Sequence, residues 1–384
     1  MLWLRLLLKN AFRHRLRAAL TILGLVVAIA SFGLLRTIVD AWYAGAKASS
    51  SARLIVRSAT SLVVPLPLAY AERLRGVDGV TALSWSNWFG GVYVEPRNFF
   101  PQFAVDARSY LPLYPEFVLP EDQKVEWFRD RRGVVVGRKL ADKFGWKLGD
   151  TIALRGTIYS GTWSFTLRGI YDGAAAGTDT GQMLLHWQFV NDTLRARGRA
   201  GDAVGVYVVG IREPENAPLV SARIDAQFRN SRAETLTETE QAFQLGFVAM
   251  SEAILMALQA VSYIVVVIIL AVMANTVAMG VRERASEYAT LKAVGFGPPS
   301  VAALVAGESL VLALAGGLLA VALTLPLAAA FGSMAGSLLP VVIVSRETIA
   351  LQLVVAAAVG LLAAAWPAWR MGRLDIVAGL RQIA

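Results

Sequence analysis

Cysteine is absent from the 384 residues of this chain. Its absence excludes disulfide bonds, thiol nucleophiles and metal sites with cysteine ligands, and it leaves the redox compartment undecided. Histidine is also scarce, with only His14 and His186 in the whole sequence. No HExxH pattern and no EF-hand loop is present. The sequence therefore predicts no metal site.

The motifs of nucleotide-using and hydrolytic enzymes are missing as well. No Gly-Lys dipeptide occurs, so the chain has no Walker A loop and cannot be a P-loop ATPase. No G-x-S-x-G elbow is present, and a Ser-His-Asp site would have to use His186. The carboxylates of Glu238 and Glu240 lie in a polar segment, where we expect both to be solvated. We therefore expect no active site and no resident cofactor, and we do not expect this chain to be an enzyme.

Apolar residues, in contrast, are in excess and gather into long runs. Hydrophobic residues make up 56% of the chain, whereas soluble domains have about 45–50%. A helix needs about 20 apolar residues to cross a bilayer. Four runs are that long, so the sequence predicts an α-helical membrane protein with four transmembrane helices. The predicted spans are 18–39, 254–281, 300–330 and 349–369.

About two hundred residues of more polar sequence separate the first two runs, which is the size of a domain. Short alternating or β-branched runs, such as 133–137 and 163–171, predict strands, and 218–228 predicts a helix. The fold class is therefore an α+β extracytoplasmic domain inserted between the first two spans, with two expected lobes. The full division is 1–17 interfacial helix, 18–39 first span, 40–240 outer domain (lobe one 53–110 and 202–235, lobe two 111–200), 241–281 stalk helix and second span, 282–299 coupling helix and turn, 300–330 third span, 331–348 outer loop, 349–369 fourth span and 370–384 tail.

Basic residues give the expected orientation. The formal net charge is +9, and the positive charges sit beside the apolar runs, which indicates anchoring at the cytoplasmic side rather than nucleic-acid binding. Both termini and the 282–299 loop are therefore expected in the cytoplasm, with the large domain outside an inner membrane. Ala28-Ile29-Ala30 resembles a signal-peptide cleavage site, but the apolar run continues through Leu35, so an uncleaved span is the preferred interpretation.

Residues 1–17 predict an amphipathic helix at the membrane interface. Its cations recur every four residues and form one basic stripe, which anionic head groups would attract. The helix is either a topology signal, which we prefer, or a lever that connects the first span to a cytoplasmic partner. The residues of the stripe are Arg5, Lys9, Arg13 and Arg17.

Few polar residues interrupt the spans. Asn275, late in the second span, is expected to hydrogen-bond between helices. Glu308, about two turns into the third span, is either a transport group or is satisfied by Arg282, Arg284 or a backbone amide. Structural satisfaction is the preferred interpretation. From about Thr237, one long helix is expected to run into the second span.

Aromatic residues between positions 85 and 100 allow two interpretations. They form either a surface for cargo or for an adaptor, or part of the core of the outer domain, which is commoner for aromatics in strands. We favour the core. The residues are Trp85, Trp88, Phe89, Phe99 and Phe100.

The stretch 275–320 is the most distinctive. A hydrophobic helix leaves the membrane, becomes charged, and stops at Gly295-Phe296-Gly297-Pro298-Pro299 before the next span. This stretch resembles the MacB/FtsX-like family of ABC transporter permeases, which includes the lipoprotein-extracting Lol permeases. Departures are the shifted Arg282-Glu283 pair, Tyr288 in place of an aliphatic residue and Lys292 in place of arginine. Residues that fall on the family pattern are Asn275, Val281, Arg284, Glu287, Leu291, Lys292, Ala293 and Gly295, then Glu308, Gly316 and Gly317, with a similar tail from Pro367 to Arg381.

The resemblance implies a homodimer or a paired permease that binds two copies of a separate ABC ATPase, which carries ATP and Mg²⁺. It implies that the first two spans transmit nucleotide-driven motion to the outer domain (mechanotransmission), with Glu287 and Lys292 in the socket for the ATPase. The residues that would couple to the ATPase are Arg282, Glu283, Arg284, Glu287, Tyr288, Leu291, Lys292, Ala293, Val294 and Gly295.

Three functions fit the resemblance. The leading one is export of a hydrophobic or amphipathic substrate with a periplasmic adaptor. The alternatives are extraction of lipoproteins or lipids from the outer leaflet of the inner membrane, and FtsX-like regulation of a cell-wall hydrolase. A membrane-anchored sensor outside this family would need a signalling module, and no cytoplasmic segment is large enough to be one.

Overall fold

The computed structural model describes residues 10–175, 177–199, 201–335 and 342–373. The chain divides into two compact units. The helical unit comprises Met1–Asp40, Glu252–Met334 and Val342–Ala384, and the α/β unit comprises Ala41–Ser251 and Ala335–Val341. Along the chain, most of the α/β unit therefore lies between the first two long helices.

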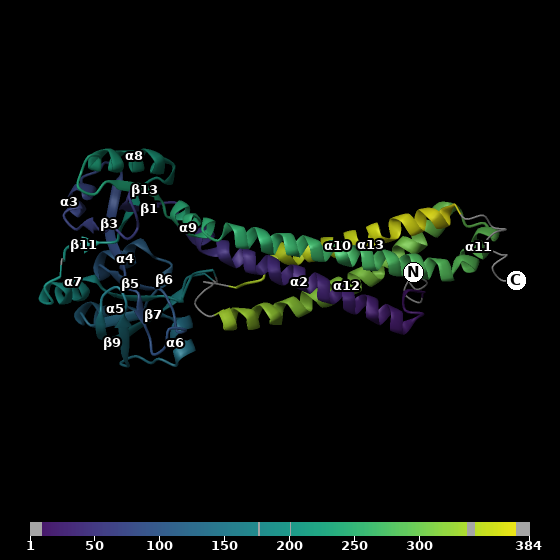
Figure 1. Ribbon diagram of the computed structural model, residues 1–384, viewed down its shortest axis with the longest axis horizontal. Coiled ribbons are helices and arrows are strands. Elements are labelled where there is room, and N and C mark those ends of the chain that lie inside the picture. Colours follow the sequence, from purple (N-terminus) through teal and green to yellow (C-terminus); the bar gives the residue numbers. More distant parts are fainter. Residues whose placement is uncertain (1–9, 176, 200, 336–341, 374–384) are drawn as a thin grey trace. The chain divides into compact units, whose positions relative to one another are not determined.

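In the described part of the helical unit, the main elements are four long helices and the short α11 (Figure 1). Within the described ranges, four helices are long and apolar enough to cross a membrane. The first has 34 residues, well beyond the predicted span, and its last turns belong to the α/β unit. The helices are α2 (Arg15–Ala48), α10 (Glu252–Glu283), α11 (Ala285–Ala293), α12 (Pro298–Ala335) and α13 (Arg346–Gly372).

Small residues let the long helices approach one another closely. A Cβ added at Gly316 would lie 2.7 Å from the Cβ of Leu25, and one at Gly360 would lie 2.6 Å from the Cβ of Ala313. Ser309 also donates a hydrogen bond of 2.6 Å from Oγ to the carbonyl oxygen of Gly360. Such contacts between small residues hold membrane helices together where the hydrophobic effect contributes little.

One mixed sheet organises the α/β unit, in the order β13-β1-β12-β3-β5-β10-β7-β9-β8-β4, with β6 beside β9. β5 with β10 and β7 with β9 are parallel pairs, and the other neighbours are antiparallel. The strands are β1 (Arg53–Ser58), β3 (Val80–Trp88), β4 (Gly91–Val92), β5 (Gln102–Val105), β6 (Phe117–Val118), β7 (Gly133–Gly137), β8 (Thr151–Gly156), β9 (Gly161–Gly173), β10 (Met183–His186), β12 (Val206–Ile211) and β13 (Thr235–Thr239), with β2 (Leu66–Pro67) and β11 (Ala203–Val204) as a separate pair.

Helices pack along this sheet (Figure 1). α3 packs against β3 and α8 against β13, whereas α5 contacts β9 and β7 and α6 contacts β7. A local sequence signal starts α4, where the Asp106 side chain accepts a hydrogen bond from the backbone N–H of Ser109. The helices are α3 (Tyr70–Arg75), α4 (Ala107–Leu113), α5 (Glu121–Arg129), α6 (Arg138–Phe144), α7 (Trp187–Ala196), the 3₁₀ helix η1 (Pro214–Asn216), α8 (Ala217–Phe228) and α9 (Glu240–Ala249).

The two lobes expected from the sequence are halves of one structure. Strands from 53–110 and 202–235 meet strands from 111–200 where β5 pairs with β10, so the sheet is continuous. One hydrophobic core includes Leu54 from the first set and Phe165 from the second. The two lobes are therefore not confirmed as separate bodies, because β5 and β10 pair across the expected boundary, which the spacing of strands along the chain does not reveal.

The aromatic residues near position 90 divide between core and surface. Phe89 and Phe100 are fully buried in the core, as preferred from the sequence. Trp85 is half-buried against Trp187 and Tyr207. The remaining two, Trp88 and Phe99, are exposed and contact each other with ring centroids 6.0 Å apart.

The segment expected to form one long helix from Thr237 has two interruptions. Residues up to Thr239 form β13, which pairs with β1. α9 follows, and Met250 and Ser251 separate it from α10. The alternation of threonine with other residues at 235–239 is the β signal that the helical expectation overlooked.

Candidate functional site

The short helix α11 and the turn after it form the centre of the candidate site, in the helical unit. α10 ends at Glu283, and the non-helical backbone of Arg284 starts α11 in a new direction. Gly295 ends α11 with φ of +105°, a backbone region that glycine tolerates best. The N–H groups of Gly295 and Phe296 donate to the carbonyl oxygens of Lys292 and Leu291, both at 3.0 Å. This is the Schellman arrangement that closes a helix.

Apolar packing fixes one side of α11. Tyr288 is only 1% exposed and lies among residues of α10, α12 and α13, together with Ala285 of its own helix. Lys292 also donates a hydrogen bond of 2.8 Å from Nζ to the carbonyl oxygen of Gly372. The side chain of Tyr288, expected to couple to a partner, is therefore part of the core instead. The packed neighbours are Val281, Val301, Leu304, Val305, Ala364, Ala368 and Met371.

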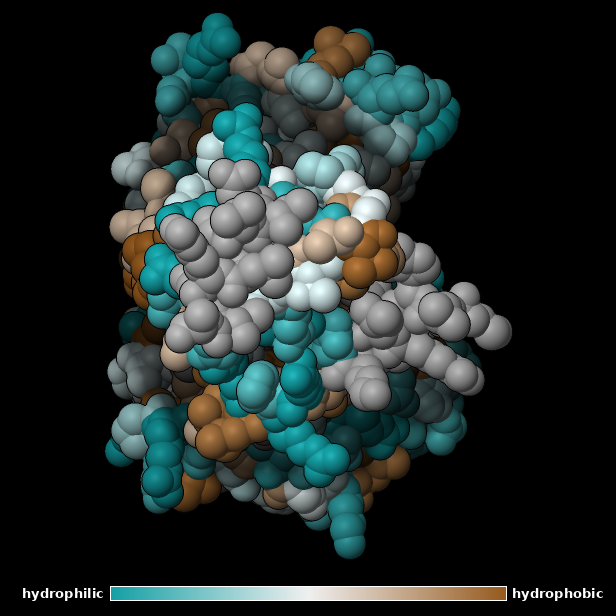
Figure 2. Space-filling view, turned by 90° about the vertical axis from the view of Figure 1, so that its right-hand side faces the viewer, coloured by the Kyte–Doolittle hydropathy of each residue, from teal (hydrophilic) through white to brown (hydrophobic). Residues whose placement is uncertain are grey.

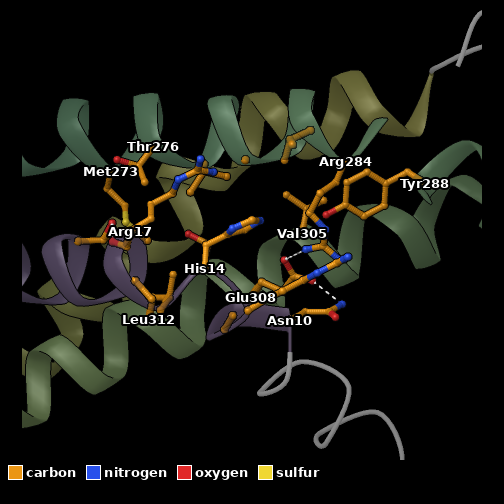
Figure 3. Close-up of a pocket in the computed structure, with 18 residues that line it drawn as sticks. Asn10, His14, Arg17, Met273, Thr276, Arg284, Tyr288, Val305, Glu308 and Leu312 are labelled. Atoms are coloured by element: carbon orange, nitrogen blue, oxygen red, sulfur yellow. Dashed lines mark hydrogen bonds and ion pairs between the residues drawn. The ribbon is translucent and has the colours of Figure 1, made fainter. Parts of the chain in front are cut away.

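Glu308 of α12 is paired, as Figure 3 shows. Arg284 donates to one carboxylate oxygen at 2.7 Å, and the Asn10 amide donates to the other at 2.9 Å. Arg284 is thus the partner for Glu308 among those that the sequence suggested. Because the carboxylate is engaged on both oxygens, its geometry is that of a structural anchor between α12 and α11.

The N-terminal segment and the start of α2 bring two more cations to this region, one to α11 and one to the end of α10. Arg13 contacts the Glu287 carboxylate at 2.5 Å, and Arg17 forms a two-pronged pair with Glu283 at 2.7 and 2.8 Å. Arg284 adds a hydrogen bond of 3.0 Å to Glu287. We call these residues, with Glu308 and Asn10, the α11 charge cluster. No sequence signal predicts these pairs, because about 270 residues separate their members.

The described part of the predicted interfacial helix is not one continuous helix. Residues 12–14 form a turn and a bend, and α2 already begins at Arg15, so Arg17 lies in the long helix. Arg13 and Arg17, expected among lipid head groups, contact carboxylates instead. The other two members of the basic stripe, Arg5 and Lys9, lie outside the described residues, as does the tail beyond Arg373.

The charge cluster sets the ionisation of its members. Burial opposes the charged form of Glu287, but hydrogen bonds from Arg284 and Arg13 outweigh it and lower the pKa of the carboxyl below its usual value. Burial also opposes the charge on Arg284, yet its aromatic and acidic neighbours raise the pKa of the guanidinium. Both groups are therefore charged at neutral pH.

A small cavity of about 90 Å³ lies beside the cluster. Polar residues that include His14, Arg17 and Glu308 line it together with apolar ones such as Met273 and Leu312 (Figure 3). Among the described residues, no group of His, Asp or Glu side chains could hold a metal ion. His186, in the α/β unit, is buried and bonds the carbonyl oxygen of Trp127 at 2.8 Å. His186 is therefore held in the α/β unit by a hydrogen bond to the backbone.

The opposite side of α11 and the turn after it are open. Val294 is 75% exposed and Phe296 is 40% exposed. Ala293, which precedes Val294, and Gly295, which lies between Val294 and Phe296, are exposed as well. We call Ala293–Phe296 the apolar turn. Figure 2 faces this end of the helical unit and shows separate hydrophobic patches among mostly hydrophilic residues. Phe296 was not among the predicted coupling residues, although its place beside two glycines indicates an exposed turn.

Asn275 does not make the expected contact. It is exposed on α10, and among the described residues it has no hydrogen-bond partner. The hydrogen bond between helices that the sequence predicts for Asn275 therefore stays a prediction.

Two family models match this chain. The MacB-like periplasmic core domain matches residues 18–227, more than half of the chain, and the FtsX-like permease C-terminal model matches 260–376. The residues that match the FtsX-like model include α11 and Glu308. A comparison with curated protein sequences gave no match.

Three solved structures are similar to part of the chain. The extracellular domain of the noncanonic ABC-type transporter YknZ from Gram-positive bacteria is 12% identical, covers 49% of this chain and 100% of its own, and has a TM-score of 0.36. The periplasmic region of MacB from Actinobacillus actinomycetemcomitans is 10% identical, covers 51% of this chain and 92% of its own, and has a TM-score of 0.38. A domain of a putative permease protein from Porphyromonas gingivalis is 15% identical, covers 49% of this chain and 88% of its own, and has a TM-score of 0.33.

The family matches agree with the architecture. The MacB-like model covers α2 and most of the α/β unit, and the FtsX-like model covers the three later apolar helices in most of their length. Together with four helices of membrane-spanning length, they indicate a multi-pass membrane protein with a domain outside the membrane. The chain therefore belongs to the MacB/FtsX-like family of ABC transporter permeases.

Proposed function

We propose that this permease binds a separate ABC ATPase through the apolar turn and transmits ATP-driven motion to its α/β unit. The observation that carries the proposal is the two-sided character of α11. One side is fixed by the buried Tyr288, and the other ends in the exposed Val294 and Phe296. A force applied to the exposed side would move the packed helices with it, because close-packed side chains transmit displacement.

The charged residues of α11 have a supporting role in this proposal. Glu287 is engaged by Arg13 and Arg284, and Lys292 by a backbone carbonyl. These bonds orient α11, and the apolar turn supplies the contact area. Buried apolar anchors contribute most of the affinity at protein interfaces, whereas charges at the rim contribute little.

The wider assembly follows from the family. We propose two copies of the ATPase with ATP and Mg²⁺, a homodimer or a paired permease, and a periplasmic adaptor. In this arrangement both termini and α11 are cytoplasmic, the α/β unit lies outside the inner membrane, and the cargo is hydrophobic or amphipathic. The basic residues near α11, which include Arg282 and Arg284, support this orientation.

Purification of the detergent-solubilised native complex tests the proposal. A P-loop ATPase should co-purify in stoichiometric amount with the wild-type chain and should be lost from Val294→Asp and Phe296→Asp variants. Val63→Asp is the matched control, because Val63 is an exposed apolar residue of the α/β unit. Retention of the ATPase in both turn variants would contradict the assignment of the turn, and its absence from the wild type would contradict the function. An accompanying adaptor would favour export, a cell-wall hydrolase would favour regulation, and a lipoprotein would favour lipid extraction.

A further inference from the structure

Arg53 is a buried cation in the α/β unit, at the first residue of β1. Its guanidinium donates to Glu240 at 2.7 Å, to the carbonyl oxygen of Leu113 at 2.8 Å and to both carboxylate oxygens of Glu116 at 2.5 and 3.1 Å. It also lies 4.2 Å from the centre of the Tyr114 ring. We call these residues the Arg53 cluster. A planar guanidinium with this many partners has little freedom to change its orientation.

Glu240 is the residue where the cluster meets the ends of two helices. It is the first residue of α9, and its carboxylate accepts from Arg53 and also from the backbone N–H of Ser50 at 3.1 Å. Ser50 lies two residues after the end of α2. One carboxylate thus joins the end of α2, the start of α9 and the start of β1. This arrangement contradicts the expectation that Glu240 is solvated, because Glu240 is buried.

The strands bring these helix ends together. β1 follows α2 in the chain, and β13 runs directly into α9. β1 and β13 are antiparallel neighbours, with Leu54 opposite Thr239. Thr239 also accepts a hydrogen bond from the N–H of Ala242 and so caps α9. A Cβ at Gly45 would lie 3.1 Å from the Gln244 side chain, so the last turns of α2 approach α9 closely.

We infer that Arg53 is a positioning residue that fixes the end of α2 and the start of α9 to the sheet, so that the three move together. The inference rests on the proposed function, since it names the joint through which motion would reach the α/β unit. The chain enters the sheet through α2 and leaves it through α9, and a flexible joint at this place would absorb displacement instead of transmitting it.

The chain offers a matched comparison four residues along the same strand. Arg57 pairs with Glu238 at 2.7 Å, also between β1 and β13. Its side chain and that of Glu238 are about a quarter exposed, whereas those of Arg53 and Glu240 are 6% and 7% exposed. In the part of the chain that the structure describes, Arg57 bonds Glu238 and the carbonyl oxygen of Ser58 but neither helix end. A substitution of Arg57 therefore removes an ion pair between β1 and β13 and leaves the bonds to the ends of α2 and α9 in place.

The absence of native cysteine allows a direct test in the full-length chain. Spin labels at Ala48→Cys and Leu245→Cys report the distance between the end of α2 and α9. A single fluorophore at Val63→Cys reports the response of the α/β unit to a non-hydrolysable ATP analogue with Mg²⁺ in the co-purified complex. Arg53→Gln should broaden the distance distribution and abolish the fluorescence response while ATP hydrolysis persists, and Arg57→Gln should change neither.

The two readouts separate the inference from the function on which it rests. If no ATPase co-purifies with the wild type, the proposed function fails, and the distance distribution still tests the joint. If Arg53→Gln keeps a narrow distribution and a full fluorescence response, the inference is wrong. Equal effects of Arg53→Gln and Arg57→Gln would also overturn it. Should Arg53→Gln fail to fold, the isosteric Glu240→Gln variant, judged by the same criteria, takes its place.

Discussion

The Arg53 cluster of the α/β unit and the Arg13–Glu287 pair of the α11 charge cluster use the same chemistry in opposite surroundings. Arg53 and Glu240 are almost fully buried. Arg13 and Glu287 have side chains that are 57% and 41% exposed. Exposed ion pairs contribute about 0–1 kcal/mol and are weakened by salt, whereas removal of one partner from a buried pair costs about 3–5 kcal/mol. The Arg53 cluster is therefore suited to a rigid joint, and the Arg13–Glu287 pair to a contact that can rearrange around the largely buried Arg284 and Glu308.

The largest expected effect comes from breaking the buried pair on one side only. Glu240→Leu leaves the Arg53 charge buried with the half-exposed Glu116 as its remaining acidic partner. We expect a loss of about 3–5 kcal/mol in the stability of the α/β unit, measured by denaturant unfolding of the full chain. Glu238→Leu is the control, and its loss should be about 0–1 kcal/mol because its pair with Arg57 is partly solvated. Similar losses in both variants would remove the distinction between the two kinds of pair.

Truncation of the buried side of α11 should come close to that effect. Tyr288→Ala removes a ring that is 1% exposed, and such large-to-small changes cost about 3–5 kcal/mol in other cores. We expect faster hydrogen exchange of the α11 backbone amides and loss of the co-purifying ATPase. Tyr263→Ala on α10, where the ring is 62% exposed, should leave the exchange of α11 unchanged. Unchanged exchange in Tyr288→Ala would show that the charge cluster alone holds α11.

Gly295 at the end of α11 can be compared with Gly246 inside α9. Gly295 has φ of +105°, and a side chain there strains the backbone by about 1–2 kcal/mol. Gly246 lies inside α9 with nothing within 4 Å of an added Cβ, where Ala is favoured over Gly by roughly 0.5–1 kcal/mol. Gly295→Ala should therefore lower the affinity for the ATPase by reorienting the apolar turn, and Gly246→Ala should preserve it. Titration of the purified ATPase onto each variant measures the difference.

The sequence predicted the helical unit far better than the contacts within it. Runs of apolar residues reveal membrane-length helices because each segment carries its own signal, and Gly295 followed by Pro298 marks the turn after α11. The family assignment from residues 275–320 is confirmed by the two family models. Local patterns also found the positions of β7 and α8. They missed the continuity of the sheet, because pairing of β5 with β10 is a long-range property.

The charge contacts show the same limit more sharply. Glu240 has the local surroundings of a solvated residue, and only the return of β13 to β1 brings it to Arg53. Arg13 and Arg17 form a regular basic stripe with Arg5 and Lys9 in the sequence, yet the described pair contacts Glu287 and Glu283. Periodicity predicts which residues share a face, whereas the partner of that face depends on tertiary packing.

The smallest expected effect is on the exposed pair of Arg13 and Glu287. The pKa of Glu287 is lowered in the folded chain, so the contact contributes stability at pH values above the usual carboxyl pKa of about 4.3 and loses it as the pH falls through the lowered value. Between pH 8 and 6 we expect no change. Salt should weaken the pair, since charges at this exposure are screened.

Arg13→Gln should therefore act like high salt at neutral pH. Hydrogen exchange of the α11 amides should increase by a small factor in the variant at low salt, and the wild type should reach the same rate near 1 M salt. The Arg53 cluster provides the internal comparison in the same experiment, because exchange at the start of β1 should not respond to salt. A salt response at β1 as large as that at α11 would contradict the division into a fixed buried cluster and an adjustable exposed one, and with it the reason for assigning the joint to Arg53 and the partner contact to α11.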